Sequence, residues 1–324
     1  VLPVVPLFHV NAWGIPYSAP MVGAKLVFPG PKMGDGETLH KLMEAERVTM
    51  ALGVPTVWTA LLQHLDSVGG TLSTVKRTLI GGAAVPESMI AEFRDKHDVE
   101  VCQGWGMTEM SPIGTVGTLK AGMAESLSAD EQVSVRAKAG RGIFGVEMRI
   151  VDEAGDELAW DGEKAGALQV RGPWVCSDYY RLEGSAGTHT EDGWFETGDV
   201  AKIDSEGYLQ ITDRTKDVIK SGGEWVSSID VENVAAGHPD IGHAAVIGVK
   251  HSKWSERPLL IVVPKEGKQP DPADILAWFD GKIASWWVPD DVVFIDEMPL
   301  TATGKIKKID LRERFANYRL PTDT

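Results

Sequence analysis

Short apolar runs alternate with amphipathic stretches over the first hundred residues, and this alternation constrains the fold more than any other feature. The runs typical of strands are residues 24–30, 48–54, 75–81 and 98–104. Between them lie three patterns typical of helices: residues 35–47, a stretch that Pro55 opens, and residues 87–97. Parallel strands need long crossover connections, which helices usually provide. The alternation therefore predicts a parallel α/β sheet.

Three glycine-containing loops follow strands of this predicted sheet. Their sequences are GVPT (53–56), GGAAVP (81–86) and QGWGMTE (103–109). Taken alone, the third loop is better explained as a turn between two elements. In open α/β sheets, however, ligands bind outside the carboxyl ends of the strands. Because all three loops are expected at that edge, we predict a nucleotide site there.

The pattern changes twice further along the chain. From about residue 140, short strands separated by Gly and Asp turns indicate a small antiparallel or barrel-like subdomain. After DRTKD (213–217), strands and helices indicate a separate α+β lobe. We therefore expect an α/β part over 1–139, a β-rich subdomain over 140–213 and a C-terminal lobe over 214–324, with a hinge near 213–217.

Composition restricts the partners of the protein. The 324 residues include 32 Lys and Arg against 47 Asp and Glu, a formal net charge of -15. This balance argues against nucleic acid or an anionic membrane surface as the main partner. No apolar run approaches the roughly 18 residues that would span a bilayer. Cys102 and Cys176 have no metal-type spacing, which favours free thiols in the reducing cytoplasm. A homodimer is left open.

Four stretches carry a family resemblance when they are taken together. They are GGAAVP (81–86), GWGMTE (104–109), the segment 193–228 from GWFETGDV to KSGGEWVSS, and PLTATGKIKK (299–308). In this order they resemble the adenylate-forming superfamily of acyl-CoA synthetases, luciferases and peptide-synthetase adenylation domains. The form KSGGEWVSS, with PLFHVNAW (6–13), is similar to medium- and long-chain fatty acyl-CoA synthetases and to methylmercaptopropionate-CoA ligases.

The resemblance implies a reaction in two steps. A carboxylate attacks the α-phosphate of ATP to give acyl-AMP and pyrophosphate, and the thiol of coenzyme A then displaces AMP to give a thioester. The implied small molecules are a fatty or other carboxylic acid, ATP, coenzyme A and Mg²⁺. Since a carboxylate attacks a polyanion here, the site has to neutralise charge rather than supply a base.

The resemblance assigns the nucleotide to residues of the glycine loops and to two later positions. Trp105 would pack on the adenine, Thr108 would hold a phosphate oxygen, and Glu109 would bind Mg²⁺. Asp199 would accept hydrogen bonds from both ribose hydroxyls, as a carboxylate can, and Arg214 would donate to the ribose or phosphate. The remaining implied nucleotide contacts are Gly81, Gly82, Ala83, Gln103, Gly104, Gly106 and Met107.

The resemblance assigns further roles to the C-terminal lobe. Lys305 would meet the α-phosphate and carboxylate oxygens during adenylation, although by itself it reads as a solvated lysine. Lys216 would lie at the hinge, and Lys220 would approach the adenylate in the second step. The loop that flanks the pantetheine passage would comprise Ser221, Gly222, Gly223, Glu224 and Trp225.

His9 and Trp13 match positions that line the acyl pocket in these relatives. A histidine beside an apolar run is as often a core residue, so the sequence leaves both roles open for His9. The family's Ser/Thr/Gly-rich phosphate loop normally lies upstream of residues 6–13. The chain starts without that loop or an initiator methionine, so we expect a fragment of a longer protein.

Three hypotheses follow from the sequence. The leading one is an ATP-dependent fatty acyl-CoA synthetase. The second is a ligase for methylmercaptopropionate or another short acid, and the third is a nucleotide-binding fragment that cannot catalyse adenylation. Pyrophosphate release separates the first from the third, and a series of acids of increasing length separates the first from the second.

Overall fold

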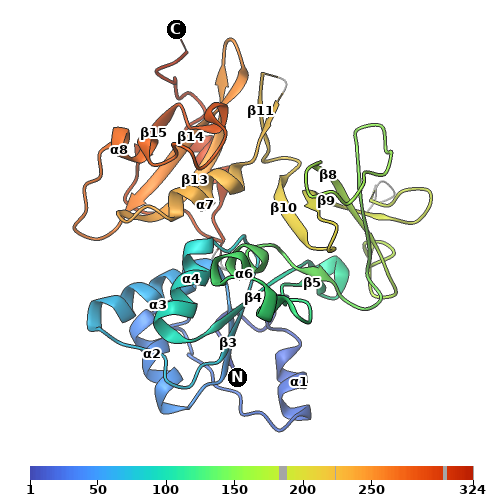
Figure 1. The fold of residues 1–324 in the computed structure, drawn as a ribbon, viewed down its shortest axis with the longest axis vertical. Coiled ribbons are helices and arrows are strands. Elements are labelled where there is room, and N and C mark those ends of the chain that lie inside the picture. The colour runs from blue at the N-terminus through green and yellow to red at the C-terminus, as the bar shows by residue number, and fades with distance from the viewer. Residues whose placement is uncertain (182–187, 223, 302–304, 324) are drawn as a thin grey trace. The chain divides into compact units, whose positions relative to one another are not determined.

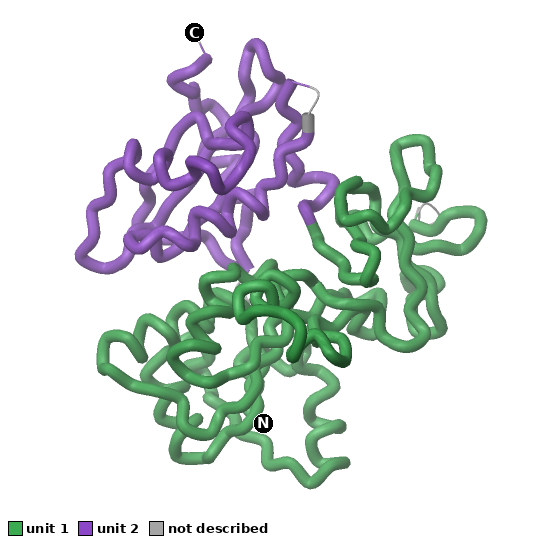
Figure 2. The backbone as a smooth tube through the Cα atoms, in the orientation of Figure 1, with its two compact units in different colours: residues 1–211 green, residues 212–324 purple. Residues whose placement is uncertain are grey.

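The computed structural model describes residues 1–181, 188–222, 224–301 and 305–323. The chain divides into two compact units, residues 1–211 and 212–324 (Figure 2). The division falls within strand β10 (Leu209–Arg214).

A six-stranded sheet forms the centre of the first unit (Figure 1), with the strand order β1-β2-β3-β4-β5-β6. The first four strands run parallel, and the last two pair in antiparallel fashion. Their bounds are β1 Leu2–Pro3, β2 Met50–Gly53, β3 Arg77–Gly81, β4 Glu100–Gly106, β5 Ile113–Val116 and β6 Arg141–Gly142. The predicted parallel α/β sheet is therefore confirmed.

The predicted helices are present at the expected places. They are α2 (Gly36–Ala45), α3 (Pro55–Val68) and α4 (Glu87–His97). Helix α3 begins with Pro55 in its first turn and ends at Gly69, which adopts the left-handed conformation with φ of 61°. The apolar faces of the three helices bury side chains in one core with the strands, among them Leu39, Trp58 and Phe93.

The structure corrects the strand expected at residues 24–30. This segment belongs to no strand, and its Val27 N–H donates to the Val1 carbonyl. An apolar run needs a ladder of such bonds to count as a strand, and Pro29 has no N–H to extend one. In the described part of the first unit, three short helices were not predicted: α1 (Ile15–Met21), α5 (Met123–Ser126) and α6 (Ala129–Arg136).

The β-rich part of the first unit is an open sheet rather than a barrel across the residues described. Its order is β10-β9-β8-β7, and β7 with β8 and β8 with β9 pair antiparallel. The remaining bounds are β7 Glu147–Val151, β8 Gly166–Arg171 and β9 Phe195–Ile203. The sheet buries one apolar cluster that includes Ile150, Val170 and Phe195.

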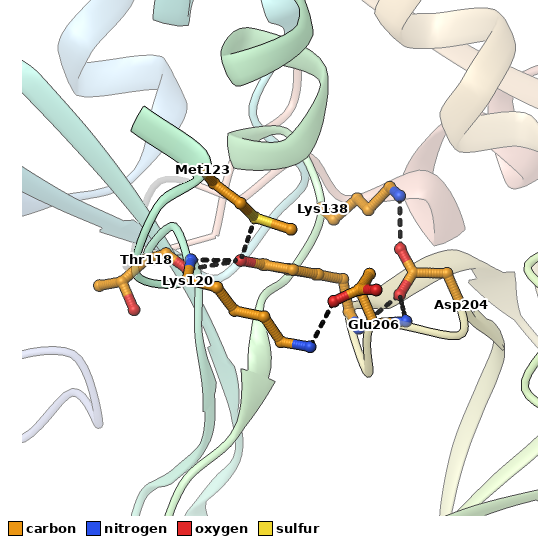
Figure 3. A network of polar contacts seen from close by, with 7 residues as sticks. Thr118, Lys120, Met123, Lys138, Asp204 and Glu206 are labelled. Atoms are coloured by element: carbon orange, nitrogen blue, oxygen red, sulfur yellow. Dashed lines mark hydrogen bonds and ion pairs between the residues drawn. The ribbon is translucent and has the colours of Figure 1, made fainter. Parts of the chain in front are cut away.

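Polar contacts join the turn between β9 and β10 to the loop that follows β5 (Figure 3). Buried Tyr208 donates its hydroxyl proton to the Thr118 carbonyl and accepts from the Lys120 N–H, at 2.9 and 3.0 Å. Lys138 pairs with Asp204 at 2.6 Å. These contacts hold β9 in place against the α/β part, which matters because Asp199 lies on β9.

The second unit contains a five-stranded sheet with helices on both faces. The order is β12-β11-β14-β13, and β15 pairs with β14 in parallel. Val246 and Leu260 pack with residues of α7 and the α8 segment, whereas Ile247 packs on the other side with Leu311 of α9. The bounds are β11 Ile219–Ser221, β12 Glu224–Val226, β13 Ile241–His251, β14 Ser255–Pro264, β15 Asp291–Phe294, α7 Ser228–Ala236, α8 Pro272–Ala277 and α9 Lys308–Arg314. Over the described part of the chain, no helix has the length and hydropathy to cross a membrane.

Candidate active site

The three glycine loops begin side by side at the edge of the six-stranded sheet that the carboxyl ends of its parallel strands form. Gly53, the last residue of β2, pairs with Ile80 of β3, next to the pair of Leu52 and Leu79. Gly81 pairs with Gly104 of β4. A Cβ atom on Gly81 would lie 3.1 Å from the Gly104 carbonyl oxygen, so this close approach favours glycine.

The segment that contains His9 reaches the same edge. Asn11 Nδ2 donates to the Gly53 carbonyl at 2.7 Å. His9 is 8% exposed, its Nδ1 accepts from the Asn11 N–H at 3.1 Å, and its carbonyl accepts from the Trp13 N–H at 3.0 Å. His9 thus shapes the turn that carries Asn11 and Trp13. The sequence reasoning missed Asn11, although it lies within the quoted PLFHVNAW motif.

The loop at 81–86 is held to β4 by a buried glutamine. The Val85 N–H donates to Gln103 Oε1 at 3.3 Å, and Gln103 is buried. Gly82, with φ of 88°, and Ala83 remain exposed at the edge. Gln103 therefore supports the loop through its side chain, while the exposed residues are those available to a ligand.

The structure brings together two residues that the sequence could only assign separately. Trp105 Nε1 of β4 donates to Asp199 Oδ2 of β9 at 2.9 Å, across 94 positions of sequence. Asp199 is 8% exposed. A Cβ on Gly114 would lie 2.6 Å from Trp105 Cζ3, so the indole lies directly against this glycine. The predicted adenine platform and the predicted ribose ligand therefore form one hydrogen-bonded pair.

The backbone on either side of this pair is specified by its own contacts. The Asp199 N–H donates to Thr197 Oγ1, which donates in turn to the Leu168 carbonyl at 2.8 Å. Gly198 between them has φ of 73°, a conformation that favours glycine. The TGD sequence is thus an irregular stretch within β9, where the pairing with β8 shifts register, and the Thr197 side chain supports the position of Asp199.

The loop after Trp105 places Thr108 and Glu109 in a short 3₁₀ turn, Thr108–Met110. A Cβ on Gly106 would lie 2.1 Å from the Pro112 carbonyl oxygen, which only glycine avoids. Met107 precedes the turn and packs against the core of the β-rich sheet. Thr108 is exposed at this edge.

Glu109 is held by a segment that the sequence reasoning did not single out. Tyr179 donates its hydroxyl proton to Glu109 Oε1 at 2.7 Å, and the Cys176 N–H donates to the Glu109 carbonyl at 2.7 Å. Burial, together with this bond to Glu109, raises the pKa of Tyr179 to about 12. No local pattern connects residues 70 positions apart, so only the fold reveals this contact.

A divalent cation at Glu109 would depend on oxygens from outside the protein. Within residues 1–181 and the other described ranges, no group of three His, Cys, Asp or Glu side chains is arranged to hold a metal. Mg²⁺ commonly binds through one or two carboxylates together with substrate phosphates and water. A single carboxylate beside an exposed threonine fits that mode of binding.

The second unit carries the other predicted residues. The Lys220 N–H donates to Glu256 Oε2 at 3.1 Å, and Lys220 lies opposite Trp225 in the β11–β12 pair. Gly222 has φ of 60°, and a Cβ there would lie 2.7 Å from Trp254 Cε3. Gly223 lies outside the described residues, and Glu224 begins β12.

A cavity of about 630 Å³ adjoins the loop at 221–222. Arg257 is part of its wall, with Nη1 3.1 Å from Ser221 Oγ and Nη2 2.6 Å from Asp290 Oδ1. The full lining is Ser221, Gly222, His251, Ser252, Lys253, Trp254, Arg257, Trp286, Asp290 and Thr322. The predicted pantetheine loop thus adjoins a cavity with aromatic and cationic walls.

Arg214, Lys216 and Lys305 lie in two segments of this unit. The N–H groups of Asp217 and Val218 both donate to the Arg214 carbonyl, which closes a turn around Lys216. The Thr301 N–H donates to the Lys305 carbonyl at 2.7 Å, and the Lys305 N–H donates to Thr301 Oγ1 at 3.0 Å. Two hydrogen bonds therefore join Thr301 to Lys305, and residues 302–304 between them lie outside the described residues.

Comparison with known proteins identifies the family. The family described as AMP-binding enzyme matches residues 1–180, and the AMP-binding enzyme C-terminal domain matches residues 230–305. The chain belongs to the AMP-binding enzyme family, and the resemblance inferred from the motifs is confirmed.

Individual relatives agree with this assignment. A 3-methylmercaptopropionyl-CoA ligase of Ruegeria lacuscaerulensis is 52% identical over 97% of this chain, and a medium-chain-fatty-acid–CoA ligase of Ectopseudomonas oleovorans is 49% identical over 99% of it. The crystal structure of ATP-bound MatB from Rhodopseudomonas palustris has a TM-score of 0.80 at 29% identity, over 98% of this chain and 60% of that one. The chain spans 58% of the length of each of the two sequence relatives.

Proposed function

We propose that the protein is an ATP-dependent acid–thiol ligase that converts a carboxylic acid into its coenzyme A thioester through an acyl-AMP intermediate. The observation that carries the proposal is the pair formed by Trp105 and Asp199 at the edge of the sheet. A flat aromatic face beside a buried carboxylate matches the two halves of adenosine, because the ring can cover the base and the carboxylate can accept from the ribose. Similarity to acyl-CoA ligases over almost the whole chain supports the same function.

In the proposed first step, the acid attacks the α-phosphate of ATP and pyrophosphate leaves. Thr108 would donate to a phosphate oxygen, and Glu109 would hold Mg²⁺. The ion, when bound, would neutralise phosphate charge. Lys305 would place an ammonium against the oxygens on which charge develops, which is worth more in a preorganised site than in water. Arg214 would add a second cation.

In the proposed second step, the coenzyme A thiol attacks the carbonyl carbon of acyl-AMP, and AMP leaves. The loop at 221–224 would flank the pantetheine arm, and Lys220 would approach the adenylate. The cavity beside Gly222 supports this proposal because its cationic and aromatic walls suit a phosphate-bearing nucleotide. The proposed hinge at Lys216 would exchange Lys305 for this loop between the steps.

We infer a fatty acid as the substrate, with His9 and Trp13 near the acyl chain. The similarity to a medium-chain-fatty-acid–CoA ligase supports this choice. A short thioether acid is the second candidate, because a relative at 52% identity is named a 3-methylmercaptopropionyl-CoA ligase. The reaction is proposed for the cytoplasm, where free thiols such as Cys102 and Cys176 persist.

The deciding experiment uses this chain extended at its N-terminus to the full length of its relatives. Pyrophosphate release and thioester formation are measured with ATP, Mg²⁺, coenzyme A, methylmercaptopropionate and straight-chain acids of increasing length. We expect acid-dependent release of pyrophosphate, and the acid with the highest kcat/KM identifies the substrate class. Absence of release with every acid would leave nucleotide binding as the better function, and binding of AMP by the present chain, measured by calorimetry, tests that third hypothesis.

A further inference from the structure

The start of helix α9 buries a lysine to which neither the family motifs nor the proposed reaction assigns a role. Lys308 Nζ lies 2.6 Å from Ser228 Oγ and 2.7 Å from Glu232 Oε1, and its side chain is 14% exposed. Glu232 Oε1 also accepts from the Val246 N–H at 2.7 Å. The ammonium is therefore tied both to helix α7 and, through Glu232, to the edge strand β13.

A second acid lies within the electrostatic reach of the same ammonium. Asp213 is 1% exposed, and its Oδ2 accepts from the Ser228 N–H at 2.8 Å. Burial raises the pKa of both Asp213 and Glu232, and the positive charge of Lys308 opposes the rise in each case. An ammonium near a buried acid, a partly buried acid and a hydroxyl is costly to displace, because its loss would leave buried charge uncompensated.

A second cation, near the other end of α9, also pairs with an acid. Arg312 lies four residues after Lys308 and therefore on the same side of the helix. Its Nη2 lies 2.5 Å from Asp217 Oδ1. Arg312 thus pairs with Asp217, and Lys308 lies within electrostatic reach of Asp213. These two acids flank the turn around Lys216.

The chain between Lys305 and Lys308 has little freedom. Leu300 and Ile306 form a β-bridge, and the Lys307 N–H donates to the Pro299 carbonyl at 2.9 Å. Pro299 and Leu300 follow Met298, which is buried in the core of the unit. The segment from Lys305 to Lys307 passes directly into Lys308, so the position of the ammonium of Lys308 determines where that segment lies.

We propose that Lys308 is a positioning residue that fixes the segment from Lys305 to Lys308 to helix α7 and to the 213–217 segment, so that Lys305 reaches the reacting phosphate in a defined place. This inference rests on the proposed function, because it concerns the adenylation step of that reaction. Lys308 itself touches no substrate. Its loss should act on the step that uses Lys305 and spare the step that does not.

The test compares Lys308→Met with Lys307→Met in the chain extended to the length of its relatives. Lys307 is the matched control, since it is the adjacent lysine, its side chain is 43% exposed, and it pairs with Asp310 at the surface. Acyl-AMP formation is followed by pyrophosphate release, and the second step is followed from chemically made acyl-AMP and coenzyme A.

We expect Lys308→Met to lower the rate of acyl-AMP formation by about tenfold or more, because small misplacements of a catalytic group are costly. The KM for ATP and the rate of the second step should stay within about threefold of the parent. Lys307→Met should leave both steps unchanged. In a Lys305→Ala background, Lys308→Met should add almost nothing, because both changes remove the same contribution.

Unpaired acids could destabilise Lys308→Met, so Lys308→Met/Glu232→Gln is measured beside it. The amide keeps the acceptor for the Val246 N–H and removes one buried charge. The selective loss of adenylation should persist in this double variant with a melting temperature close to that of the parent. Unchanged adenylation, a parallel loss of both steps, or an additive loss in the Lys305→Ala background would overturn the inference. A parent enzyme that releases no pyrophosphate refutes the proposed function instead.

Discussion

The pair of Trp105 and Asp199 allows the nucleotide site to be tested by a change of one atom. Asp199→Asn removes the negative charge but keeps an oxygen that can accept the indole N–H of Trp105, which lies 2.9 Å from Oδ2 in the parent. Asp199→Ala removes both. The comparison therefore separates recognition of the ribose from support of the indole.

The expected magnitudes follow from the hydrogen bonds involved. A hydrogen bond to a charged group contributes roughly 1.5–3 kcal/mol, so Asp199→Asn should weaken AMP binding by about 10- to 150-fold. Asp199→Ala should weaken it at least as much and also destabilise the fold, because a polar group left unsatisfied on burial costs about 1–3 kcal/mol. In a unit of this size, each kcal/mol lowers the melting temperature by roughly 2–4 °C.

The assay is calorimetric titration of the present chain with AMP and with 2′,3′-dideoxy-AMP, together with thermal unfolding of each variant. The parent should prefer AMP, whereas Asp199→Asn should bind both ligands about equally and melt near the parental temperature. Trp105→Phe keeps an aromatic face and loses the donor, so it should lower the preference for AMP by roughly 1 kcal/mol. Trp160→Phe, at a partly exposed tryptophan away from this pair, is the control.

Two results would each refute this account of Asp199. If Asp199→Asn binds AMP as tightly as the parent does, the carboxylate is not a ribose ligand. If it weakens AMP and the dideoxy nucleotide equally, the acid supports the loop without contacting the hydroxyls. Either outcome would leave the Trp105 contact as a purely structural hydrogen bond.

Three further predictions test other parts of the chain. In the chain extended to the length of its relatives, Lys305→Ala should raise the free-energy barrier to acyl-AMP formation by about 3–4 kcal/mol, which slows this step by two or more orders of magnitude. Thioester formation from supplied acyl-AMP should stay near the parental rate. Equal loss in both steps would contradict the separate roles. Burial lowers the pKa of His97, whose two ring nitrogens have no hydrogen-bond partner among the described residues, so its folded-state pKa lies below the unfolded value. The stability of the fold should therefore decrease as the pH drops below about 6.5. Urea midpoints should show a smaller decrease for His97→Phe. Gly106→Ala should destabilise the first unit by about 1–3 kcal/mol because its Cβ would meet the Pro112 carbonyl at 2.1 Å, whereas Gly34→Ala, which meets nothing within 4 Å, should melt like the parent.

Much of the first unit could be predicted from local patterns. Helix α4 occupies residues 87–97 as predicted, and α3 begins at Pro55, because apolar periodicity and proline at a helix start act over a few residues. The run at 24–30 shows the limit of the method. Its composition is typical of a strand, but a strand exists only where a neighbour completes the ladder, and no local pattern reports on that neighbour.

The candidate site also has features that local sequence patterns predicted and features that they did not. By itself, the sequence determined the glycine loops, the order of the motifs and the family, because these depend on residue types at short spacing. The tertiary structure alone decided that Trp105 donates to Asp199, that Tyr179 holds Glu109, and that Lys308 lies with Glu232. Each of these contacts joins residues 70 or more positions apart, and their geometry depends on how whole sheets and helices pack. Such contacts are set by the sum of many packing interactions, and a local stretch of sequence contains only a small part of that sum.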